Sequence, residues 1–571
     1  AWEIYKVTGD QQWLRTIYPI VKKSMAADLK NVLDKETGLV RGESSFLDWR
    51  EQTYPGWMEP ADIFQSVCLG TNAVHHEANK VLASMAKALG ETDVANRHAR
   101  IADGIKKAVN DHLWLDDRQY YAQYLYGRNF RIPSPRSEAL GEALCILFDI
   151  ADPQRQKHLV ANTPVNDFGI PCIYPQIPDT PPYHNDAIWP FVQSYWTMAS
   201  AKAGNEKAVL HSLAAIWRPA ALFLTNKENF VAGTGDYAAT QINSDNMLWS
   251  LSGSIAMIYK VLFGMDYRAD AITFRPFVPQ ALKGKHTLTN YHYRDAILAV
   301  DMEGFGNEIK SITLNGKPLP NATVPSTLKG RHYVKIVLAD KPLGGEVNMA
   351  PHHVTPTSPA LSHGDSALVW SRSKHGVRYK VMLNGKLLKE AVDTTLRMPG
   401  NQFAEYQVIA VDRNGHESFA SAPMLSTPAG ILIVEAESCN TTIENRYHGF
   451  SGDGYVRTSP AENPVIKFQF TAEHDGSYAI DFRYANGNGP VNTDNKCAMR
   501  TMKVDGQSHG TVVLPQRGRE EWSDWGFSSG VMISLTKGDH EISLEYEPHN
   551  ANMSVSVNEA VVDYVRIIRT K

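Results

Sequence analysis

Residues 14–32 read L-R-T-I-Y-P-I-V-K-K-S-M-A-A-D-L-K-N-V, and apolar residues return in this stretch every three or four positions. Leu14, Ile17, Val21, Met25 and Leu29 therefore share one side of a helix, which predicts a buried face. Similar patterns cover roughly 60–89, 92–112, 136–150, 186–204, 206–218 and 244–263. We therefore expect an all-helical domain at residues 1–265, with long loops between its helices. Long loops between packed helices commonly carry function.

The helical period stops near Asp266, and alternating strand-like runs begin. One run covers residues 292–301, and another, I-K-S-I-T-L-N-G, ends in an Asn-Gly pair typical of a hairpin turn. Because 571 residues exceed what one hydrophobic core organises, we expect several domains. The predicted fold is a helical domain followed by all-β sandwich domains: a small sandwich at 266–352 appended to the helices, a module at 353–427 after a Pro/Ser/Thr-rich linker, and a module at 428–571.

Composition excludes several classes of protein. The formal net charge of -4 and the pI near 6.6 give no electrostatic basis for binding nucleic acid. No run reaches the roughly 18 apolar residues of a membrane span, so we expect a soluble protein without one. The five cysteines lie far apart without a C-x-x-C pair, which argues against a zinc site and against a disulfide framework.

The stretch S-S-F-L-D-W-R-E-Q-T-Y-P-G-W-M-E-P, residues 44–60, sets carboxylates among indoles in a loop between helical segments. Asp48 follows Phe46 and Leu47 and precedes Trp49. A packed apolar wall of this kind raises the pKa of a carboxyl group, as a general acid requires. The alternative for Asp48 is a helix cap or an ion pair with Arg50 or Arg41.

Other acidic residues near this stretch have two interpretations each. Glu51 is either an acceptor for sugar hydroxyls or the acid itself, and Trp57 offers a ring for stacking. For Glu59, capping the helix that begins at Pro60 or pairing with an arginine is the favoured role. Glu138 and Glu142 lie one helical turn apart, and either face the domain centre or stabilise the first turn of their helix.

A second loop, residues 169–196, reads G-I-P-C-I-Y-P-Q-I-P-D-T-P-P-Y-H-N-D-A-I-W-P-F-V-Q-S-Y-W. Polar groups interleaved with aromatic rings are what a sugar needs, because its hydroxyls form hydrogen bonds in the ring plane and its faces stack. We therefore expect substrate contacts from Tyr183, His184, Asn185, Asp186 and Trp189.

Three elements carry a family resemblance: F-L-D-W, Y-H-N-D-A-I-W-P and N-S-D-N-M-L-W-S-L-S-G-S. Together they resemble the six-hairpin, (α/α)6-barrel glycosidases, especially the glucosidase domains of glycogen-debranching enzymes and the processing α-glucosidase I group. The resemblance implies Asp48 as general acid, with His184, Asn185 and Trp189 lining the sugar subsite. Asp186 stands where these relatives mostly have glycine, so specificity is expected to differ.

The second catalytic carboxylate is expected in the loop V-A-G-T-G-D-Y-A-A-T-Q-I-N-S-D-N-M-L-W-S, residues 231–250. Asp236 and Asp245 are the candidates. Asp236 is preferred as the base because Asp245 fits better at the start of the last helix. The relatives more often have glutamate there. With two such carboxylates roughly 6.5–9.5 Å apart, the expected chemistry is inversion, without a cofactor.

The ring of helices is predicted to be incomplete. A six-hairpin barrel needs twelve helices, and about eight are recognised before the β region. The chain opens with Ala1 in what resembles the middle of a helical repeat. A mature or truncated chain is therefore expected, with a missing N-terminal segment or a complementary chain completing the barrel, since an open wall exposes apolar surface.

The last two modules resemble known β domains. V-R-Y-K-V-M-L-N-G-K-L and Y-Q-V-I-A-V-D-R-N-G-H-E-S resemble a fibronectin type III module, expected to act as a spacer. I-V-E-A-E, G-F-S-G-D-G-Y-V, F-R-Y-A-N-G-N-G and V-D-Y-V-R-I resemble jelly-roll carbohydrate-binding modules of secreted polysaccharide-degrading enzymes. The second resemblance implies a structural calcium ion held by Glu435, Glu437 and Asp563. A glycan platform is expected from Trp522, Trp525, Tyr484 and Asn486, with one tryptophan in the core.

The leading functional hypothesis is an inverting, exo-acting glycoside hydrolase for α-linked oligosaccharides, brought to its polysaccharide or oligosaccharide substrate by the C-terminal module. A secreted, periplasmic or cell-surface location is expected. Two alternatives are a carbohydrate phosphorylase, which would need basic groups around phosphate, and a non-catalytic glycan-binding protein that has lost its base.

Overall fold

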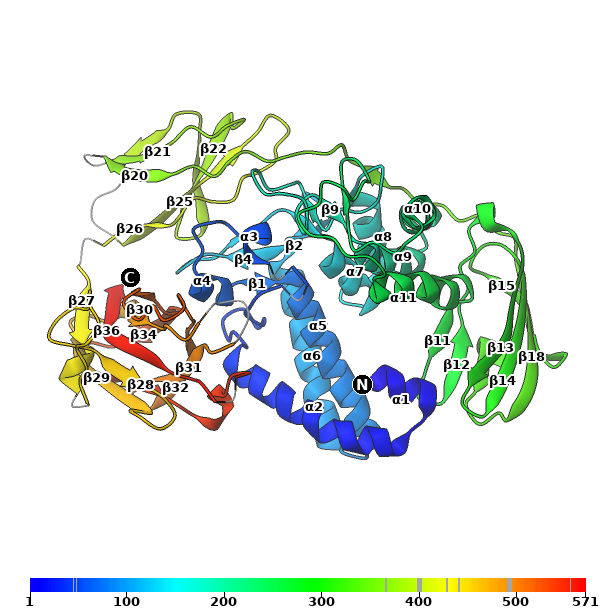
Figure 1. Cartoon of the computed structure of the whole chain (residues 1–571), viewed down its shortest axis with the longest axis horizontal. Coiled ribbons are helices and arrows are strands. Elements are labelled where there is room, and N and C mark those ends of the chain that lie inside the picture. The colour runs from blue at the N-terminus through cyan, green and yellow to red at the C-terminus, as the bar shows by residue number, and fades with distance from the viewer. Residues whose placement is uncertain are drawn as a thin grey trace.

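The computed structural model describes residues 1–571 except 45, 48, 365–366, 398–402, 428–429, 440–441, 490–494 and 555. A helical domain occupies the centre, one β domain lies at the α11 end, and two β domains lie at the opposite end (Figure 1). The structure thus has the predicted succession of a helical region followed by β domains.

The principal helices are amphipathic or buried segments joined by long loops. They are α1 (Trp2–Thr8), α2 (Gln11–Asn31), α3 (Arg50–Thr53), α4 (Pro60–Phe64), α5 (Leu69–Ala88), α6 (Thr92–His112), α7 (Ala139–Leu147), α8 (Pro153–Asn162), α9 (Pro190–Lys202), α10 (Glu206–Phe223) and α11 (Leu248–Ala256), the last continued by a π-helical turn (Met257–Leu262).

The helices form two rows. Helices α5, α7, α9 and α11 contact one another in succession, while α6 packs on α5 and α10 packs on α9. Helix α7 is buried at nearly every position, whereas α6 buries only one side, from His98 to Val109. A helix that is apolar all round belongs inside, and a helix with one apolar stripe belongs outside. Contacts and burial thus distinguish an inner row, α5, α7, α9 and α11, from the outer helices α6 and α10.

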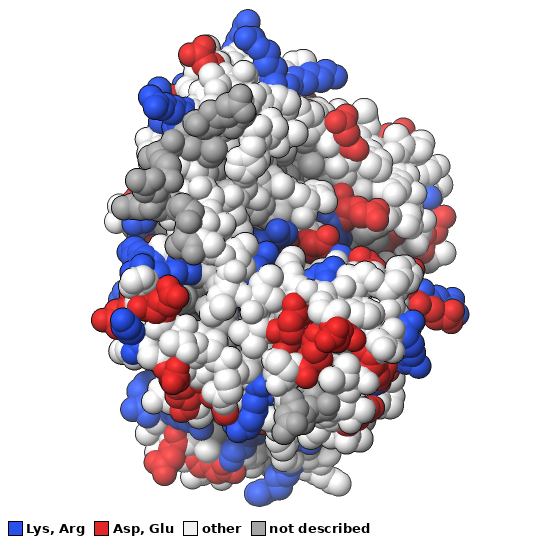
Figure 2. Space-filling model, turned by 90° about the vertical axis from the view of Figure 1, so that its left-hand side faces the viewer, with Lys and Arg blue, Asp and Glu red and all other residues white. Residues whose placement is uncertain are grey.

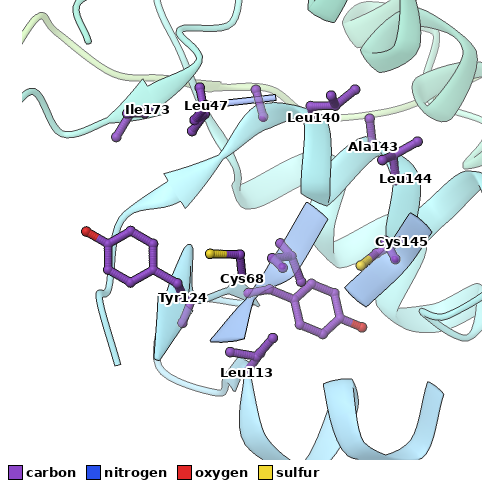
Figure 3. Packing of buried hydrophobic residues seen from close by; sticks show 14 of the residues in the cluster. Leu47, Cys68, Leu113, Tyr124, Leu140, Ala143, Leu144, Cys145 and Ile173 are labelled. Carbon is purple, nitrogen blue, oxygen red and sulfur yellow. The ribbon is translucent and has the colours of Figure 1, made fainter. Parts of the chain in front are cut away.

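The main core joins these helices to the loops. Figure 3 shows Leu47, Cys68 and Tyr124 beside Leu140 and Leu144 of α7. The same cluster includes side chains from the third domain, among them Met382, Ile409 and Phe419. The core thus continues from the helical domain into a β domain.

One end of the inner row stays open to solvent. Large apolar side chains on the loop after α10 and on α11 are exposed. They are Leu224, Ile242, Leu248, Trp249, Leu251 and Ile255.

The second domain packs two sheets around Phe274, Leu298 and Ile336. Its larger sheet has the order β13-β14-β18-β15-β16, in which β14 and β18 are parallel. Its strands are β11 (Met265–Tyr267), β12 (Ala271–Phe274), β13 (Gly284–Tyr293), β14 (Ala296–Gly304), β15 (Ile309–Leu314), β16 (Lys317–Pro318), β17 (Thr323–Pro325) and β18 (Gly330–Leu338).

The connection to the third domain runs back over the helical domain. Strand β19 (Asn348–Met349) pairs in parallel with β7 (Pro164–Val165), and Val354 bridges to Gln176. Part of the predicted linker is therefore tied to the loop that precedes α9.

The third domain is a sandwich of a three-stranded and a four-stranded sheet around Trp370, Tyr406 and Val408. The strands are β20 (Leu361–Gly364), β21 (Ala367–Trp370) and β24 (Thr395–Arg397) in one sheet, and β22 (Arg378–Leu383), β23 (Lys386–Ala391), β25 (Ala404–Val411) and β26 (Met424–Ser426) in the other.

The third domain is not a simple spacer, because it packs directly on the helical domain. Trp57 Nε1 donates to the Ala420 carbonyl at 2.9 Å, and the Ala420 N–H donates to the Tyr126 hydroxyl at 2.8 Å. The buried Arg136 guanidinium lies over the Phe419 ring at 4.0 Å. The two domains therefore share one largely apolar interface, in which Arg136 Nη2 donates to the Thr355 hydroxyl at 3.0 Å.

The C-terminal domain is a sandwich of two antiparallel sheets, one with the order β27-β36-β30-β33, joined by β28 and β34, and one with the order β29-β35-β31-β32. The strands are β27 (Leu432–Glu435), β28 (Val456–Thr458), β29 (Val465–Ala472), β30 (Gly476–Ala485), β31 (Ala498–Val504), β32 (Gln507–Leu514), β33 (Gly526–Phe527), β34 (Val531–Leu535), β35 (Gly538–Glu545) and β36 (Ala560–Arg569). It contacts the helical domain through Gln65 Nε2, which donates to the Gly530 carbonyl at 2.6 Å.

The face formed by the two last domains carries mixed charge. Figure 2 shows Lys and Arg interspersed with Asp and Glu, and one gathering of acidic side chains in its lower half. Among the described residues on this face there is no continuous basic surface of the kind that a polyanion requires.

The Tyr126 hydroxyl gives a test of the domain interface. In Tyr126→Phe the buried Ala420 N–H loses its acceptor, so we expect the free energy of unfolding to fall by about 1–3 kcal/mol. Chemical denaturation measures this change. Tyr195→Phe is the control, because in the described part of the chain its hydroxyl has no hydrogen-bond partner. Equal stability of both variants would contradict the interface.

Glu138 is the N-cap of α7, and its carboxylate accepts the Gly141 N–H at 2.9 Å. The first-turn interpretation of Glu138 is therefore correct. Glu142 is also buried and accepts the Tyr121 N–H at 3.0 Å. Burial raises the pKa of Glu138 to about 7, and it raises the pKa of Glu142 as well.

The raised pKa of Glu138 predicts how stability depends on pH. Between its ordinary value of 4.5 and about 7, the unfolded chain loses this proton while the folded chain keeps it, so stability falls as pH rises. Glu138→Gln stays neutral, and its unfolding free energy should gain up to about 3 kcal/mol relative to the parent between pH 4.5 and 8. Denaturation at several pH values measures this. If the unfolding free energies of the variant and the parent changed with pH in parallel, the raised pKa of Glu138 would be refuted. Glu36→Gln, at an exposed position, is the control.

Candidate functional site

An aromatic cluster lies where the loops at 42–57 and 174–189 meet. The Phe46 ring lies 5.2 Å from His184 and 5.1 Å from Trp189, measured between ring centroids. Tyr183 lies 4.8 Å from His184. Trp49 packs edge-on against Tyr183 at 5.2 Å. The structure thus brings together residues from both predicted loops.

Asp48, the predicted general acid, lies outside the described residues. Its neighbours are described: Leu47 is buried in the main core, and Trp49 is half-buried against Tyr183. No structural statement on Asp48 follows from them.

The buried Gln52 amide links three loops. Its Oε1 accepts the Asn185 N–H at 3.1 Å, and its Nε2 donates to Gln241 Oε1 at 2.7 Å. The Gln241 N–H in turn donates to the Pro182 carbonyl at 2.8 Å. These bonds fix the relative positions of α3, the loop before α9 and the loop before α11.

Asn185 has a positioning role. Its Oδ1 accepts the Ile177 N–H at 2.7 Å, and its Nδ2 donates to the carbonyls of Ile177 and Thr180 at 3.1 and 3.0 Å. With its amide engaged inside its own loop, Asn185 shapes the site and does not present its side chain to a sugar. The predicted direct contact from Asn185 is therefore corrected.

Asp186 has a backbone φ of 50°, in the left-handed region. Asp and Asn tolerate this region better than most residues with a β-carbon, which explains how Asp stands where glycine is usual in the relatives. Its Oδ1 lies 2.9 Å from Nε2 of His352. Burial raises the pKa of Asp186, and His352 acts in the opposite direction. The Asp186 carboxylate therefore contacts the connection between the second and third domains, which contains His352.

His184 is buried, and burial lowers its pKa to about 4. The imidazole is therefore neutral at physiological pH, which suits hydrogen bonding to an uncharged sugar.

Trp189 lies under the aromatic cluster with 1% of its surface exposed, and its Nε1 donates to the Tyr183 carbonyl at 2.7 Å. The Trp189 ring packs against the rings of Tyr183 and His184. Trp57 lies elsewhere: its ring packs on Tyr126, and its Nε1 donates to the Ala420 carbonyl of the third domain. Glu51 is exposed at the edge of α3. Of the predicted subsite residues, His184 and Trp189 lie in the aromatic cluster together with Phe46, Trp49 and Tyr183.

Glu228 is a functional candidate that the sequence patterns missed. It lies at the start of the loop after α10, and the pairing of β10 (Phe230–Val231) with β9 (Ala187–Ile188) brings it to the aromatic cluster. Its Oε1 accepts the Tyr183 hydroxyl at 3.3 Å. Its Oε2 is buried and has no hydrogen-bond partner among the described residues, although the side chain is only 7% exposed.

Asp236 and Asp245, the two candidates for the general base, both lie outside the aromatic cluster. Asp236 is exposed, and its Oδ1 accepts the N–H of Ala238 at 2.9 Å in a tight turn. Asp245 is exposed and pairs with Lys227 at 2.6 Å. Because α11 begins at Leu248 after Met247, the expected helix-capping role of Asp245 is wrong. The Lys227 ammonium also lies 3.9 Å from the Tyr237 ring centroid.

Glu59 has both of its expected roles. It lies in a capping box with Asp62 at the start of α4, and it pairs with Arg517 of the C-terminal domain at 3.0 Å. This carboxylate therefore helps to dock the C-terminal domain.

The C-terminal domain has an aromatic group that contains both predicted tryptophans. Trp522 stacks on Tyr447 at 5.9 Å, and Trp525 lies 5.5 Å from Tyr455. Both indoles are half-buried, so neither belongs to the hydrophobic core as had been expected of one of them. The Arg457 guanidinium lies 4.8 Å from the Trp522 ring centroid, and the Arg483 guanidinium lies 5.3 Å from the Trp525 ring centroid, so each indole already contacts protein groups.

Tyr484 and Asn486 are not part of a surface platform. Tyr484 is 1% exposed and donates its hydroxyl to the Pro515 carbonyl at 2.9 Å. Asn486 is 0% exposed and donates to the Leu514 carbonyl at 3.0 Å. Because both side chains are enclosed in the sandwich, their prediction as glycan contacts is wrong.

The three carboxylates predicted to bind calcium converge on the turn at 451–453. Ser451 donates its N–H to Asp563 at 3.0 Å and its hydroxyl to Glu435 at 2.7 Å. The Asp453 N–H donates to Glu437 at 2.8 Å. Among the described residues, no group of three or more His, Cys, Asp and Glu side chains is arranged to hold a metal ion.

Comparison with known proteins identifies the class of the helical region. Residues 1–246 match the family model described as the mannosylglycerate hydrolase MGH1-like glycoside hydrolase domain. The prediction of a glycosidase domain is therefore confirmed.

Curated relatives match a short part of the chain. A cycloisomaltooligosaccharide glucanotransferase of Niallia circulans is 30% identical over 111 residues, which are 19% of this chain and 11% of the relative. Endo-1,4-beta-xylanase B of Cellvibrio japonicus (strain Ueda107) is 29% identical over 120 residues, 20% of this chain and 18% of the relative. The chain thus spans less than a fifth of the length of these relatives.

Solved structures match about a quarter of the chain. A family 35 carbohydrate-binding module from Cellvibrio japonicus is 20% identical, covering 25% of this chain and 95% of the module, with a TM-score of 0.20. A Paenibacillus sp. cycloisomaltooligosaccharide glucanotransferase complexed with cycloisomaltoheptaose is 27% identical, covering 24% of this chain and 18% of that chain, also with a TM-score of 0.20. The chain thus combines a glycoside hydrolase domain at residues 1–246 with the β-sandwich domains that follow it.

Within the described residues, no helix has the length and apolar character needed to cross a bilayer.

The hydrogen bonds of the Asn185 side chain predict that removing this side chain lowers the stability of the protein. Asn185→Ala removes three hydrogen bonds to the 177–180 segment, so we expect the free energy of unfolding to fall by about 2–4 kcal/mol. Denaturant titration measures it. Asn162→Ala, which loses one bond within its own helix, is the matched control. A loss no larger than in this control would contradict the positioning role.

Proposed function

We propose that the protein is a glycoside hydrolase that cleaves α-linked oligosaccharides from a chain end with inversion of configuration. The observation that carries this proposal is Glu228, a nearly buried carboxylate that is hydrogen-bonded to Tyr183 inside the aromatic cluster. Aromatic rings around a buried carboxylate supply both sugar stacking and acid–base chemistry.

In this proposal Asp48 is the general acid and Glu228 is the general base that activates water. We propose Glu228 in place of Asp236, since Asp236 is exposed and engaged in its own turn. Glu228 Oε2, which has no hydrogen-bond partner within the described ranges, would accept a proton from water, while Tyr183 holds Oε1. Asp48 would protonate the glycosidic oxygen as water attacks the opposite face of the sugar.

The aromatic groups would bind the sugar at the chain end. Trp49 and Tyr183 present ring surface, and the neutral His184 imidazole is suited to a hydroxyl. No cofactor is needed for this chemistry. For the fold, we propose that the two rows of helices belong to an (α/α)6 barrel, with domains at 1–265, 266–352, 353–427 and 428–571 and a fibronectin type III-like third domain.

We assign glycan attachment to the C-terminal domain, with the half-buried Trp522 and Trp525 as the platform. A structural calcium ion at Glu435, Glu437 and Asp563 remains what the resemblance implies: the buried Glu435 Oε2 and Glu437 Oε2 have no hydrogen-bond partner in the described part of the chain, whereas Asp563 is already paired with Arg483. The hard carboxylate oxygens suit this cation. A secreted, periplasmic or cell-surface location follows from the resemblance to modules of secreted enzymes.

Activity should be tested on a panel of substrates that includes α-glucosides and α-mannosides. Glucose is the first sugar to test because of the resemblance to debranching and processing glucosidases, and the name of the matched family adds mannosylglycerate. A phosphorylase is less well supported, because Lys227 is already paired with Asp245. Parallel assays with and without phosphate separate the two reactions.

Substitution of three carboxylates tests the assignment. Asp48→Asn and Glu228→Gln should each lower kcat for monosaccharide release by about 100-fold or more, because each removes an acid or base from the reaction. Asp236→Asn should retain activity within about threefold. Initial rates of sugar release measure all three.

Binding by these variants separates catalysis from folding. Glu228→Gln should still bind the substrate, since the amide keeps the shape and the Tyr183 contact. Full activity in Glu228→Gln together with its loss in Asp236→Asn would restore Asp236 as the base. Glycan binding without turnover by the parent protein would instead indicate a non-catalytic binding protein.

A further inference from the structure

A cavity of about 450 Å³ lies where the helical domain meets the third domain. One wall is α3 with the loop that follows it, including Glu51 and Pro55, and the second wall is the 177–180 segment. The third wall is the segment 356–358 together with Phe419 of the third domain. The cavity therefore exists only because the third domain is docked on the helices.

Both helical-domain walls continue directly into the proposed active site. Helix α3 follows Trp49 and carries Gln52, which is bonded to Asn185. Asn185 also holds Ile177 and Thr180 by its side chain. A ligand in the cavity would thus contact segments that are rigidly attached to the aromatic cluster.

The chemistry of the walls is that of a neutral sugar site. The carboxylates of Glu51 and Asp179 are exposed and make no hydrogen bond or ion pair with any described residue. Carboxylates of this kind accept hydrogen bonds from pairs of sugar hydroxyls, and the proline and phenylalanine side chains offer apolar surface. Arg50, which also lines the cavity, is paired with Glu43 at 2.8 Å, and Lys374 and Arg413 line only the adjoining, larger cavity.

The cavity has room to extend. A second cavity of about 640 Å³ shares Pro178, Asp179 and Thr357 with the first and continues between the 177–180 segment and the loops of the third domain. The two cavities together form a groove along the domain interface.

We propose that the first cavity binds the glycosyl units that follow the scissile bond, and that it selects neutral oligosaccharides over anionic conjugates. This inference rests on the proposed function and extends it to the substrate class. An anionic group would meet Glu51 and Asp179, whereas sugar hydroxyls would donate to them. Thr357 and Ser358, which line the cavity, would then contribute to substrate specificity from the third-domain side.

Chain-length dependence tests the proposal. The ratio of kcat/KM for an α-linked tetrasaccharide to that for the disaccharide should be about tenfold or more in the parent protein, because each carboxylate contact adds substantial binding. Asp179→Asn, which suits the left-handed backbone at this position, and the cavity-filling Ser358→Trp should each lower this ratio by about fivefold. The exposed Glu36→Gln is the control and should leave the ratio unchanged.

Charge selection is tested with a neutral trisaccharide and its counterpart ending in glucuronic acid. The parent should prefer the neutral substrate by about tenfold, and Asp179→Asn should narrow the preference. A parent ratio near one between tetrasaccharide and disaccharide, or unchanged ratios in both variants, would overturn the inference.

Calorimetry keeps the inference testable if no hydrolysis is found. Tetrasaccharide should then bind the parent more tightly than Ser358→Trp, and the difference isolates the cavity from the C-terminal module. Equal affinities would reject the cavity as a glycan site, whereas a difference would support it even though the hydrolase proposal had failed.

Discussion

The buried amide of Gln52 is the interaction on which the arrangement of the candidate site depends. It accepts a hydrogen bond from the backbone of Asn185 and donates one to Gln241, so three loops that are far apart in sequence are held in one register. Since a buried amide left unpaired costs free energy, the three loops stabilise one another. The aromatic cluster, the Glu228 carboxylate and the walls of the interdomain cavity are all built on these loops.

The domain interfaces extend this arrangement beyond the helices. Phe419 and Ala420 enter the main core, while Gln65 and Glu59 attach the C-terminal domain to the loop region. The β domains are therefore in direct contact with the segments that surround the site. In an enzyme with binding modules, such contact fixes the orientation of the modules relative to the catalytic groups and reduces the entropy lost on binding a long substrate.

Much of the fold was predictable because helical and strand periodicities are local properties of the sequence. The aromatic loop at 183–189 was also found from its composition, and its proximity to Phe46 and Trp49 followed from the resemblance. Glu228 was missed because it precedes the loop at 231–250 in which the base was expected, and only the pairing of β9 with β10 brings it to Tyr183. Tyr484 and Asn486 were misassigned because only the packing of the sandwich shows that both side chains are enclosed.

The most direct test of the account is proton NMR of the sugar first released from an α-linked oligosaccharide by the parent protein. An acid and a base on opposite faces of the sugar ring predict that the β-anomer appears first and then mutarotates to the equilibrium mixture. First appearance of the α-anomer would show retention and contradict the assignment of Asp48 and Glu228 as an inverting pair. Absence of release across the panel would contradict the hydrolase itself.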